Sequence, residues 1–280
     1  MAPLVSVICL CYNHARFVRA ALQSVIDQTY SPIELMVIDD SSTDDSANII
    51  AEFVSQHPEI VFIHLPVNRG NCHAFNKGLA RANGKYVIDL AADDILLPDR
   101  VDLGVALMEA NPNCGVQFSD SEIIDEEGHP LGFHSDRFPH STIPSGKIFT
   151  ELLSRYFINS PTMMVRKSLL DELRGYDESL AYEDFDFWVR SAQGTDYLYI
   201  PKALIRKRTV KNSLGNLQHS RNSLQQSSTL KVCLKAEALC KSPEEFQALK
   251  KRVAYELKRA VVAVSPGLAW GYIKLLGRLP

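Results

Sequence analysis

Strand-like and helix-like segments alternate at short, even spacing through the first hundred residues of this chain. Four apolar runs, at residues 5–11, 33–38, 60–64 and 86–90, have the composition of short buried strands. The segments between them place apolar side chains at helical spacing. Alternation of this kind predicts βαβ units, which build a parallel sheet with right-handed crossovers. The expected fold class is therefore α/β, with a mostly parallel central sheet flanked by helices.

Two of these strands are followed by adjacent carboxylates. Asp39 and Asp40 come directly after the second strand, and Asp93 and Asp94 follow the fourth strand after two alanines. Ligands of open α/β sheets bind beyond the carboxyl ends of the strands. Mg²⁺ and Mn²⁺ take one or two protein carboxylates and share the rest of their shell with phosphates and water. The pairs indicate a metal or nucleotide site, although a single aspartate pair is also a common helix cap.

The composition restricts the class of protein. With 280 residues, 46% of them hydrophobic and 22% charged, and a formal net charge of −3, the chain can form a sizeable core and lacks the basic bias of nucleic-acid binders. We therefore expect no nucleic acid as a partner. The six cysteines form no Cys-x-x-Cys pair, which favours reduced packing thiols. Without a secretory signal or an apolar run of about 18 residues, a cytoplasmic location is expected.

The regular alternation of strand-like and helix-like segments ends beyond residue 100. We expect a strand over 114–119, a hairpin turn near 125–128 and another strand over 162–166. Residues 129–147 are rich in Pro, His, Ser and Gly and show little periodicity, which predicts a long surface loop. Long loops in compact domains often carry function, so substrate recognition is expected there.

The C-terminal part is predicted to be helical. Ser242 is a good N-cap, Pro243 suits the first helical position, and Glu245 completes a capping box. The tail over residues 268–279 is amphipathic and carries aromatic and basic side chains. Such a helix is suited to lie on a membrane surface. A helix that packs against the preceding α/β domain, or against a second subunit in a homodimer, fits the same pattern.

Together these segments resemble the family 2 glycosyltransferases of the GT-A fold. The resemblance covers roughly residues 4 to 210, and its specificity comes from the order and spacing of several short motifs. The motifs are Val5-Ser-Val-Ile with Tyr12-Asn13, Ser24-Val-Ile-Asp-Gln28-Thr, Glu34-Leu-Met-Val-Ile-Asp39-Asp40-Ser-Ser-Thr-Asp44-Asp, Asn68-Arg-Gly70, Asn76-Lys-Gly78, Gly84-Lys-Tyr, Asp93-Asp94-Ile-Leu-Leu-Pro98 and Tyr182-Glu-Asp184-Phe-Asp-Phe-Trp188.

The resemblance implies an inverting transfer of a sugar from a nucleotide-diphosphate donor, with a UDP-sugar favoured, to an acceptor hydroxyl. A Mn²⁺ or Mg²⁺ ion would stabilise the leaving diphosphate. The implied GT-A domain has a Rossmann-like nucleotide-sugar-binding half over residues 1–100 and an acceptor half over 101–211, followed by a helical extension over 212–280. The implied acceptor is a saccharide or lipid-linked saccharide in cell-surface polysaccharide or glycolipid biosynthesis, which allows a peripheral position at the inner face of the membrane.

The resemblance also implies roles for individual residues. Asp40 is expected to contact the nucleotide base with Asp39 beside it, and Asp93 to bind the metal with Asp94 as a second or supporting carboxylate. Asp184, which opens a helix, is the expected general base, with Glu183 as the alternate. A structural role for these two acids at the positive end of a helix dipole is the competing interpretation. The remaining expected nucleotide-binding residues are Tyr12, Asn13, Asn68, Gly70 and Asn76.

Two departures from the family pattern leave alternatives open. Ala91 occupies the position of the usual first carboxylate of the Asp-x-Asp motif, and Phe75 replaces a common arginine. Arg69, His73 or Lys77 could supply the lost positive charge, or could be ordinary loop and helix residues. A catalytically degenerate protein that binds a nucleotide or a partner is the alternative function. A nicotinamide-dependent oxidoreductase is disfavoured, because no Gly-x-Gly-x-x-Gly follows the first strand.

Overall fold

The computed structural model describes residues 2–139, 142–210 and 224–280. The chain divides into two compact units, which we describe separately. Unit 1 consists of Met1–Gly146, Ile158–Tyr176 and Thr195–Thr209, and unit 2 consists of Lys147–Phe157, Asp177–Gly194 and Val210–Pro280. Two stretches of the expected acceptor half, residues 147–157 and 177–194, thus belong to the same unit as the C-terminal helices. The expected boundary between residues 211 and 212 lies outside the described residues.

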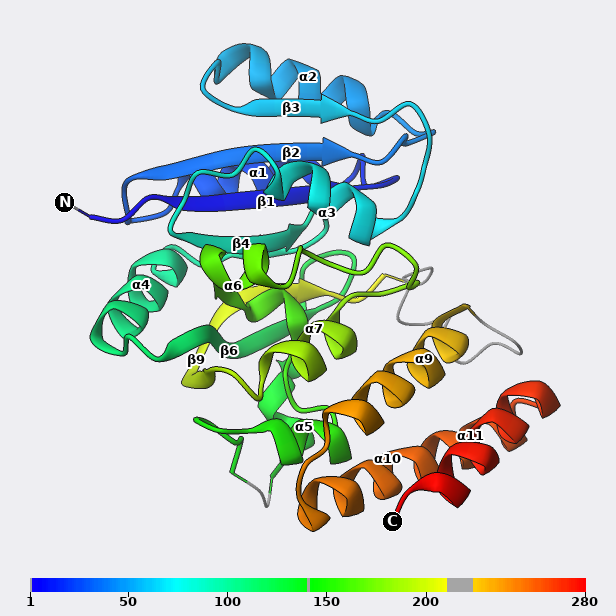
Figure 1. Cartoon of the computed structure of the whole chain (residues 1–280). Coiled ribbons are helices and arrows are strands. Elements are labelled where there is room, and N and C mark those ends of the chain that lie inside the picture. The colour runs from blue at the N-terminus through cyan, green and yellow to red at the C-terminus, as the bar shows by residue number, and fades with distance from the viewer. Residues whose placement is uncertain (1, 140–141, 211–223) are drawn as a thin grey trace. The chain divides into compact units, whose positions relative to one another are not determined.

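One mixed sheet runs through unit 1 (Figure 1). Its first four strands are parallel, β6 and β9 are parallel to each other, and β5, β7 and β8 run antiparallel to their partners. The strand order is β3 (Val61–His64), β2 (Ile33–Asp39), β1 (Val5–Cys11), β4 (Tyr86–Ala91), β8 (Met164–Arg166), β6 (Cys114–Ile124), β9 (Asp196–Arg208) and β5 (Ile95–Leu96), with β7 (Pro130–Phe133) paired to β6. The predicted α/β class is confirmed.

The register of the parallel strands brings three strand ends together. Cys11, the last residue of β1, lies opposite Asp39 at the end of β2, and Leu10 lies opposite Ala91 at the end of β4. The segments that follow β1, β2 and β4 therefore leave the sheet at the same edge. This edge is where an open α/β sheet places its ligands.

Helices cover both faces of the parallel strands. Side chains of α1 (Val18–Ile26), α2 (Ser46–Gln56) and α4 (Arg100–Ala110) share one core cluster with alternate residues of β1, such as Val7 and Cys9. Helix α3 (Asn71–Leu79) packs on the other side of β1 and β2. A Cβ atom at Gly78 would come within 2.5 Å of the Ile8 side chain, so glycine permits this close approach. Helix α6 (Lys167–Glu172) follows β8.

The second half of unit 1 differs from the sequence-based expectation. Strand β6 extends to Ile124, and the expected strand over 162–166 is a 3₁₀ turn, Ser160–Thr162, followed by the short β8. The segment expected as a loop over 129–147 contains β7 and a second 3₁₀ turn, His134–Arg137. The long β9 was not predicted, because Pro201 and several basic residues break its apolar alternation. Shifts in the β6–β9 register accommodate this interruption.

Unit 2 is helical in its described residues. It contains α5 (Phe149–Ser154), α7 (Asp184–Ser191), α9 (Leu224–Leu239), α10 (Pro243–Val262) and α11 (Pro266–Arg278), and α10 packs against α5, α9 and α11. The predicted capping box is confirmed, since Ser242 Oγ accepts from the Glu245 amide and the Glu245 carboxylate accepts from the Ser242 amide. Within residues 2–139, 142–210 and 224–280, no helix has the length and apolar character needed to cross a membrane.

Candidate active site

Asn13 fastens the loop after β1 to the loop after β2. Its backbone has a φ of 59°, a left-handed conformation that asparagine tolerates better than most residues. The Asn13 Oδ1 atom accepts hydrogen bonds from the Thr43 amide at 2.7 Å and the Asp44 amide at 3.3 Å. The Asn13 amide in turn donates to Ser42 Oγ at 2.9 Å. Asn13 therefore lies at the expected edge of the sheet, and its contacts there order the two loops.

Asp39 is fully buried at the end of β2 and is held by polar contacts from two elements. Its carboxylate accepts hydrogen bonds from the Ser42 amide at 3.0 Å and from the Ser42 hydroxyl. The Nδ1 atom of His64, at the end of β3, lies 2.8 Å from Asp39 Oδ2. These contacts make Asp39 a rigid base for the loop that follows β2.

Asp40 organises the segment between β3 and α3. One oxygen of its buried carboxylate accepts from the Arg69 amide at 3.0 Å, and the other accepts from the Gly70 amide at 2.8 Å. Gly70 has a φ of 88°, which favours glycine, and precedes the first residue of α3. Asn68 is exposed on the same segment. Asp40 thus shapes the loop that contains two of the expected nucleotide-binding residues, Asn68 and Gly70.

Tyr12 is the exposed aromatic residue of this edge. It directly follows β1, and 45% of its surface is accessible to solvent. An exposed aromatic ring next to polar loops can stack against a planar base. Among the candidate replacement cations, Arg69 and Lys77 are exposed, whereas His73 is buried.

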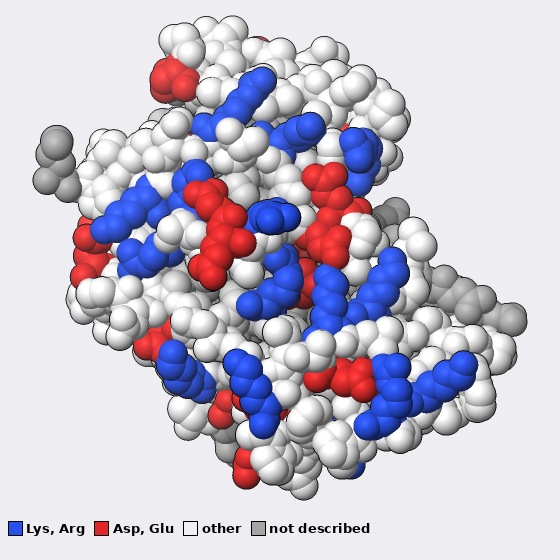
Figure 2. All heavy atoms as spheres, in the orientation of Figure 1, with Lys and Arg blue, Asp and Glu red and all other residues white. Residues whose placement is uncertain are grey.

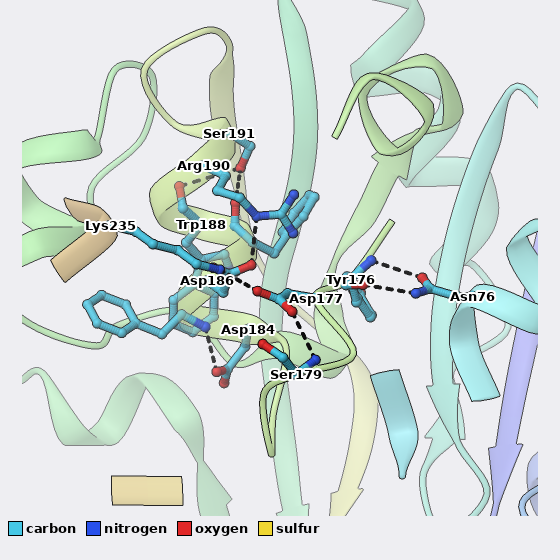
Figure 3. A network of polar contacts seen from close by, with 12 residues as sticks. Asn76, Tyr176, Asp177, Ser179, Asp184, Asp186, Trp188, Arg190, Ser191 and Lys235 are labelled. Atoms are coloured by element: carbon cyan, nitrogen blue, oxygen red, sulfur yellow. Dashed lines mark hydrogen bonds and ion pairs between the residues drawn. The ribbon is translucent and has the colours of Figure 1, made fainter. Parts of the chain in front are cut away.

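The Asn76 side chain forms hydrogen bonds with the backbone of Tyr176 and thereby braces the turn at that residue (Figure 3). Its Nδ2 atom donates to the Tyr176 carbonyl at 2.9 Å, and its Oδ1 atom accepts from the Tyr176 amide at 2.9 Å. Phe75 is buried and stacks on the Tyr176 ring with centroids 4.1 Å apart. The phenylalanine that replaces a common arginine is therefore a packing residue, and the geometry favours a bracing role for Asn76 over the nucleotide contact expected from the sequence.

Asp93 and Asp94 have different surroundings. Asp94 is buried, and its Oδ1 accepts from the Arg208 amide at 2.9 Å. Burial and the neighbouring Asp93 carboxylate raise the pKa of Asp94 to about 8. The Asp93 side chain keeps 12% of its surface exposed. Asp93 is therefore the more accessible carboxylate of the pair, and the buried contact of Asp94 fits the supporting role that the sequence also allowed for it.

Arg208, at the end of β9, acts as a clamp on the Asp93–Asp94 turn, because its guanidinium group donates hydrogen bonds to backbone carbonyls of this turn and of a neighbouring turn. Its Nε donates to the Asp93 carbonyl at 3.1 Å, and its Nη1 donates to two carbonyl oxygens in the β6–β7 turn. The guanidinium carbon also lies 4.6 Å from the centre of the Phe17 ring. Sequence reasoning missed Arg208, because it belongs to the strand that was not predicted.

His14 is the second residue that sequence reasoning missed at this edge. Its Nδ1 atom is buried, has no hydrogen-bond partner within the part of the chain that the structure describes, and lies 3.9 Å from Asp93 Oδ1. An imidazole nitrogen beside a carboxylate oxygen is a donor pair that fits a divalent metal. Larger His, Cys, Asp or Glu groups suited to a metal are absent from the described residues. Phosphate and water oxygens would have to complete the shell.

The acidic residues of unit 2 are described by themselves. Glu183 is the N-cap residue of α7, and Asp184 begins the helix, with its Oδ1 accepting from the Phe185 amide at 2.6 Å. Asp186 is buried, and its carboxylate accepts hydrogen bonds from Lys235 Nζ at 2.5 Å and from Arg190 Nε at 2.6 Å (Figure 3). Asp186 is therefore neutralised within unit 2, and Asp184 and Glu183 are the partly exposed carboxylates of this helix start.

The surface charges are mixed in sign. Figure 2 shows basic and acidic side chains interspersed over the visible face, and the net charge of the chain is −3. A nucleic-acid interface usually requires a continuous basic surface. The visible face has no such surface.

Comparisons with known proteins agree with the fold and the motifs. The model of glycosyl transferase family 2 matches residues 6–174. An uncharacterised glycosyltransferase of Methanocaldococcus jannaschii is 33% identical over 192 residues, which cover 67% of this chain and 64% of that protein. TuaG of Bacillus subtilis, a glycosyltransferase named for teichuronic acid biosynthesis, is 29% identical over 61% of this chain and 66% of that protein. The chain thus spans slightly less than two thirds of each of these two relatives.

Solved structures show the same fold at low sequence identity. TarS of S. aureus (residues 1–349), in complex with UDP-GlcNAc, has a TM-score of 0.68 and 17% identity over 89% of this chain and 71% of that one. The mannosyltransferase PcManGT of Pyrobaculum calidifontis, in complex with GDP-Man and Mn²⁺, has a TM-score of 0.71 and 18% identity over 100% of this chain and 76% of that one. The expected GT-A fold is confirmed. With more than half of its length matched by the family model, the chain belongs to glycosyl transferase family 2.

Proposed function

We propose that this chain transfers a sugar, with inversion, from a nucleoside-diphosphate donor to an acceptor hydroxyl. The observation that carries the proposal is the arrangement at the carboxyl edge of the sheet in unit 1. Asp39 and Asp40 order the loops after β2 and β3, and Asp93 keeps a partly exposed carboxylate after β4. Loop amides, an exposed tyrosine and one accessible carboxylate at this edge suit a nucleotide and its metal-bound diphosphate.

The donor proposal assigns a role to each part of this edge. Tyr12 stacks on the nucleobase, and the exposed Asn68 and the neighbouring Gly70 contact the nucleotide from the loop that Asp40 orders. Asp93 holds the Mn²⁺ or Mg²⁺ ion, which when bound neutralises the charge that develops on the leaving diphosphate. We favour a UDP-sugar, in keeping with the UDP-GlcNAc complex of TarS, while the GDP-Man complex of PcManGT makes a GDP-sugar the competing donor.

Asp184 is the proposed general base, with Glu183 as the alternate. The support is the match of the Tyr182 to Trp188 motif to the family and the pairing of the neighbouring Asp186 with Lys235 and Arg190. That pairing leaves Asp186 without the freedom to accept a proton from an acceptor hydroxyl. The base would take the proton from the attacking hydroxyl as the bond to the anomeric carbon forms.

A catalytically degenerate protein is the second candidate, and Ala91 is the observation that favours it. This candidate would bind the nucleotide without transferring the sugar. The experiment that separates the two follows a panel of UDP- and GDP-sugars with saccharide acceptors by NMR, which reports both turnover and the anomeric configuration of the product. Inverted product from the wild type, and none from Asp184→Asn at nearly unchanged nucleotide affinity, supports the transferase. Nucleotide binding without turnover on any acceptor supports the degenerate protein.

The proposed acceptor is a saccharide or lipid-linked saccharide of a cell-surface polysaccharide or glycolipid. The name of the relative TuaG supports a polysaccharide pathway. A lipid-linked acceptor would require the enzyme to work at the inner face of a membrane. The surface of helices α10 and α11 is suited to that location.

The outward side of α11 combines apolar and basic side chains. Trp270 and Ile273 are 58% and 47% exposed, and Lys274 lies on the same side of the helix because these residues are three and four positions apart. Val262 and Val264 are exposed where α10 ends and the chain turns into α11. Residues 257–280 contain four basic residues and no acidic one. Arg259 and Arg278 pair with Glu256 and Glu237, so the attraction to an anionic lipid surface rests on Lys258 and Lys274, and pairing with a second copy would bring these like charges together.

Flotation with phosphatidylcholine vesicles, with and without phosphatidylglycerol, tests this location. We expect the full chain to float only with the anionic vesicles, and Trp270→Ser combined with Lys274→Glu to abolish flotation. Arg81→Glu, an exposed charge reversal in unit 1, serves as the control and should float normally. A chain that sediments as a dimer and ignores both vesicles would replace the membrane with a second subunit as the partner of this surface.

A further inference from the structure

The loop that carries His14 is fixed on both sides of the residue. The His14 amide donates to Ser46 Oγ at 2.9 Å, and its carbonyl accepts from the Phe17 amide at 2.8 Å at the start of α1. The next amide, of Ala15, donates to Asp44 Oδ2 at 3.0 Å. The imidazole packs edge-on against the Phe17 ring, with centroids 6.5 Å apart. Both the backbone and the ring plane of His14 are therefore defined by the surrounding protein.

The Nδ1 atom of this imidazole ring lies beside the Asp93 carboxylate. The His14 Nδ1 atom is buried and lies 3.9 Å from Asp93 Oδ1, which is too long for a hydrogen bond. Within the described part of the chain it has no hydrogen-bond partner. A buried polar atom without a hydrogen-bond partner lowers the stability of a fold by roughly 1–3 kcal/mol, so native proteins usually supply a partner for it. The missing partner must be small and must suit both the nitrogen and the carboxylate oxygen.

A water molecule or a divalent cation meets both conditions, and the metal-bound diphosphate of the proposed function favours the cation. Two donors on neighbouring positions of one ion, each about 2 Å from it, lie about 3 Å apart. Closing the 3.9 Å separation to that value requires a movement of about 1 Å, which rotation of the Asp93 carboxylate can provide. Arg208 holds the backbone of Asp93 through the Asp93 carbonyl, so the carboxylate can turn without displacing the loop.

We infer that His14 Nδ1 binds the divalent metal together with Asp93 and takes the ligand position that alanine at 91 leaves vacant. The inference rests on the proposed function, because it concerns the metal of that same site. It also sets the metal preference. Imidazole nitrogen binds Mn²⁺ and later transition ions better than Mg²⁺, which prefers oxygen ligands. The site should therefore select Mn²⁺ or Co²⁺ over Mg²⁺.

Pulsed electron paramagnetic resonance of the full chain with Mn²⁺ and UDP tests the inference directly, because it detects a nitrogen bound to Mn²⁺. We expect a directly coordinated nitrogen in the wild type and its loss in His14→Gln and His14→Ala, with Mn²⁺ affinity reduced by about tenfold or more and Mg²⁺ affinity reduced less. His129→Ala removes an exposed histidine and is the matched control. Thermal melts establish that each variant is folded, and any affinity tag must be free of histidine.

Each outcome has a separate meaning. Bound Mn²⁺ without a coordinated nitrogen in the wild type, or an unchanged nitrogen signal in both His14 variants, overturns the role of His14 and leaves the proposed transferase standing. Absence of Mn²⁺ binding even with UDP overturns both the His14 inference and the metal-assisted function. Equal preference for Mg²⁺ and Mn²⁺ in the wild type would also contradict a nitrogen ligand.

Discussion

Asp40 Oδ2 accepts a hydrogen bond from the Gly70 amide at 2.8 Å and thereby ties the end of β2 to the start of α3. The other carboxylate oxygen accepts from the next amide along the loop. A family motif residue that was expected to contact the nucleotide therefore holds the loop before α3 in place. Loss of this side chain should affect stability and binding together.

Asp40→Ala is expected to lower both the free energy of unfolding and the affinity for UDP. The substitution leaves two loop amides without their acceptor, which should destabilise the fold by roughly 2–3 kcal/mol. Urea unfolding and calorimetry measure the two effects, with the exposed Asp27→Asn as control. A variant with wild-type stability but no nucleotide binding would show that Asp40 serves the ligand alone.

Phe75→Arg, which restores the common family residue, is expected to destabilise the chain by about 3 kcal/mol or more without improving nucleotide affinity. Phe75 is buried and stacks on Tyr176, so an arginine there would lose the packing and bury a charge. Phe75→Leu, which stays apolar, should lose less stability. A stable Phe75→Arg protein that binds UDP more tightly would contradict the packing role.

Arg208→Met is expected to weaken Mn²⁺-dependent nucleotide binding, because the Asp93–Asp94 turn loses its clamp. Arg206 lies two residues away on the same strand but is 48% exposed and pairs with Glu122, so Arg206→Met is the matched control. We expect a loss of about tenfold in Mn²⁺-dependent UDP affinity for Arg208→Met and less than about twofold for the control. Equal effects of the two substitutions would refute the clamp.

The raised pKa of the Asp89 carboxyl group predicts that the stability of the fold depends on pH. Burial raises the pKa of this β4 carboxyl to about 7, although a hydrogen bond with Tyr176 opposes the shift. In the unfolded chain an aspartate has a pKa of about 3.9, so between these values the folded state binds more protons than the unfolded state. The stabilising contribution is present below pH 4 and is lost as the pH rises toward 7, with a slope of at most about 1.4 kcal/mol per pH unit.

Asp89→Asn should remove that slope, because its amide does not titrate. Urea unfolding of the wild type and the variant at pH 5 and pH 7.5 measures the difference, since contributions from groups that do not interact with Asp89 cancel between the two proteins. The variant should gain stability relative to the wild type as the pH rises. An unchanged stability difference at the two pH values would mean that the Asp89 pKa is not raised in the folded chain.

The sequence identified the strand ends of the parallel half and their carboxylates because these depend on local patterns. An apolar run that stops at Asp39 or shortly before Asp93 is visible within a few residues. Ser42 is a local partner of Asp39, but the other partners of these carboxylates come from distant segments and were not visible. Arg208 reaches Asp94 across more than a hundred residues, from a strand that Pro201 interrupts, and Asn76 meets Tyr176 across a hundred positions. Such contacts follow from the tertiary fold alone.

The different burial of Asp93 and Asp94 could not be predicted from the sequence either. The sequence presents two adjacent, chemically identical side chains, and only their different burial separates a partly exposed carboxylate from one held by the Arg208 amide. The His14 nitrogen is a similar case, since a histidine in a polar loop is usually an ordinary surface residue. The burial of its Nδ1 atom beside Asp93, which the sequence does not show, is what distinguishes His14 from such a residue.

Calorimetric titration of UDP and GDP, with and without Mn²⁺, tests the central claim that the carboxyl edge of β1, β2 and β4 binds a nucleoside diphosphate through a metal at Asp93. We predict that one nucleotide binds, that Mn²⁺ strengthens this binding by about tenfold or more, and that Asp93→Asn loses the strengthening while retaining the metal-independent binding. Absence of binding by either nucleotide, or equal strengthening by Mn²⁺ in Asp93→Asn, would contradict the account.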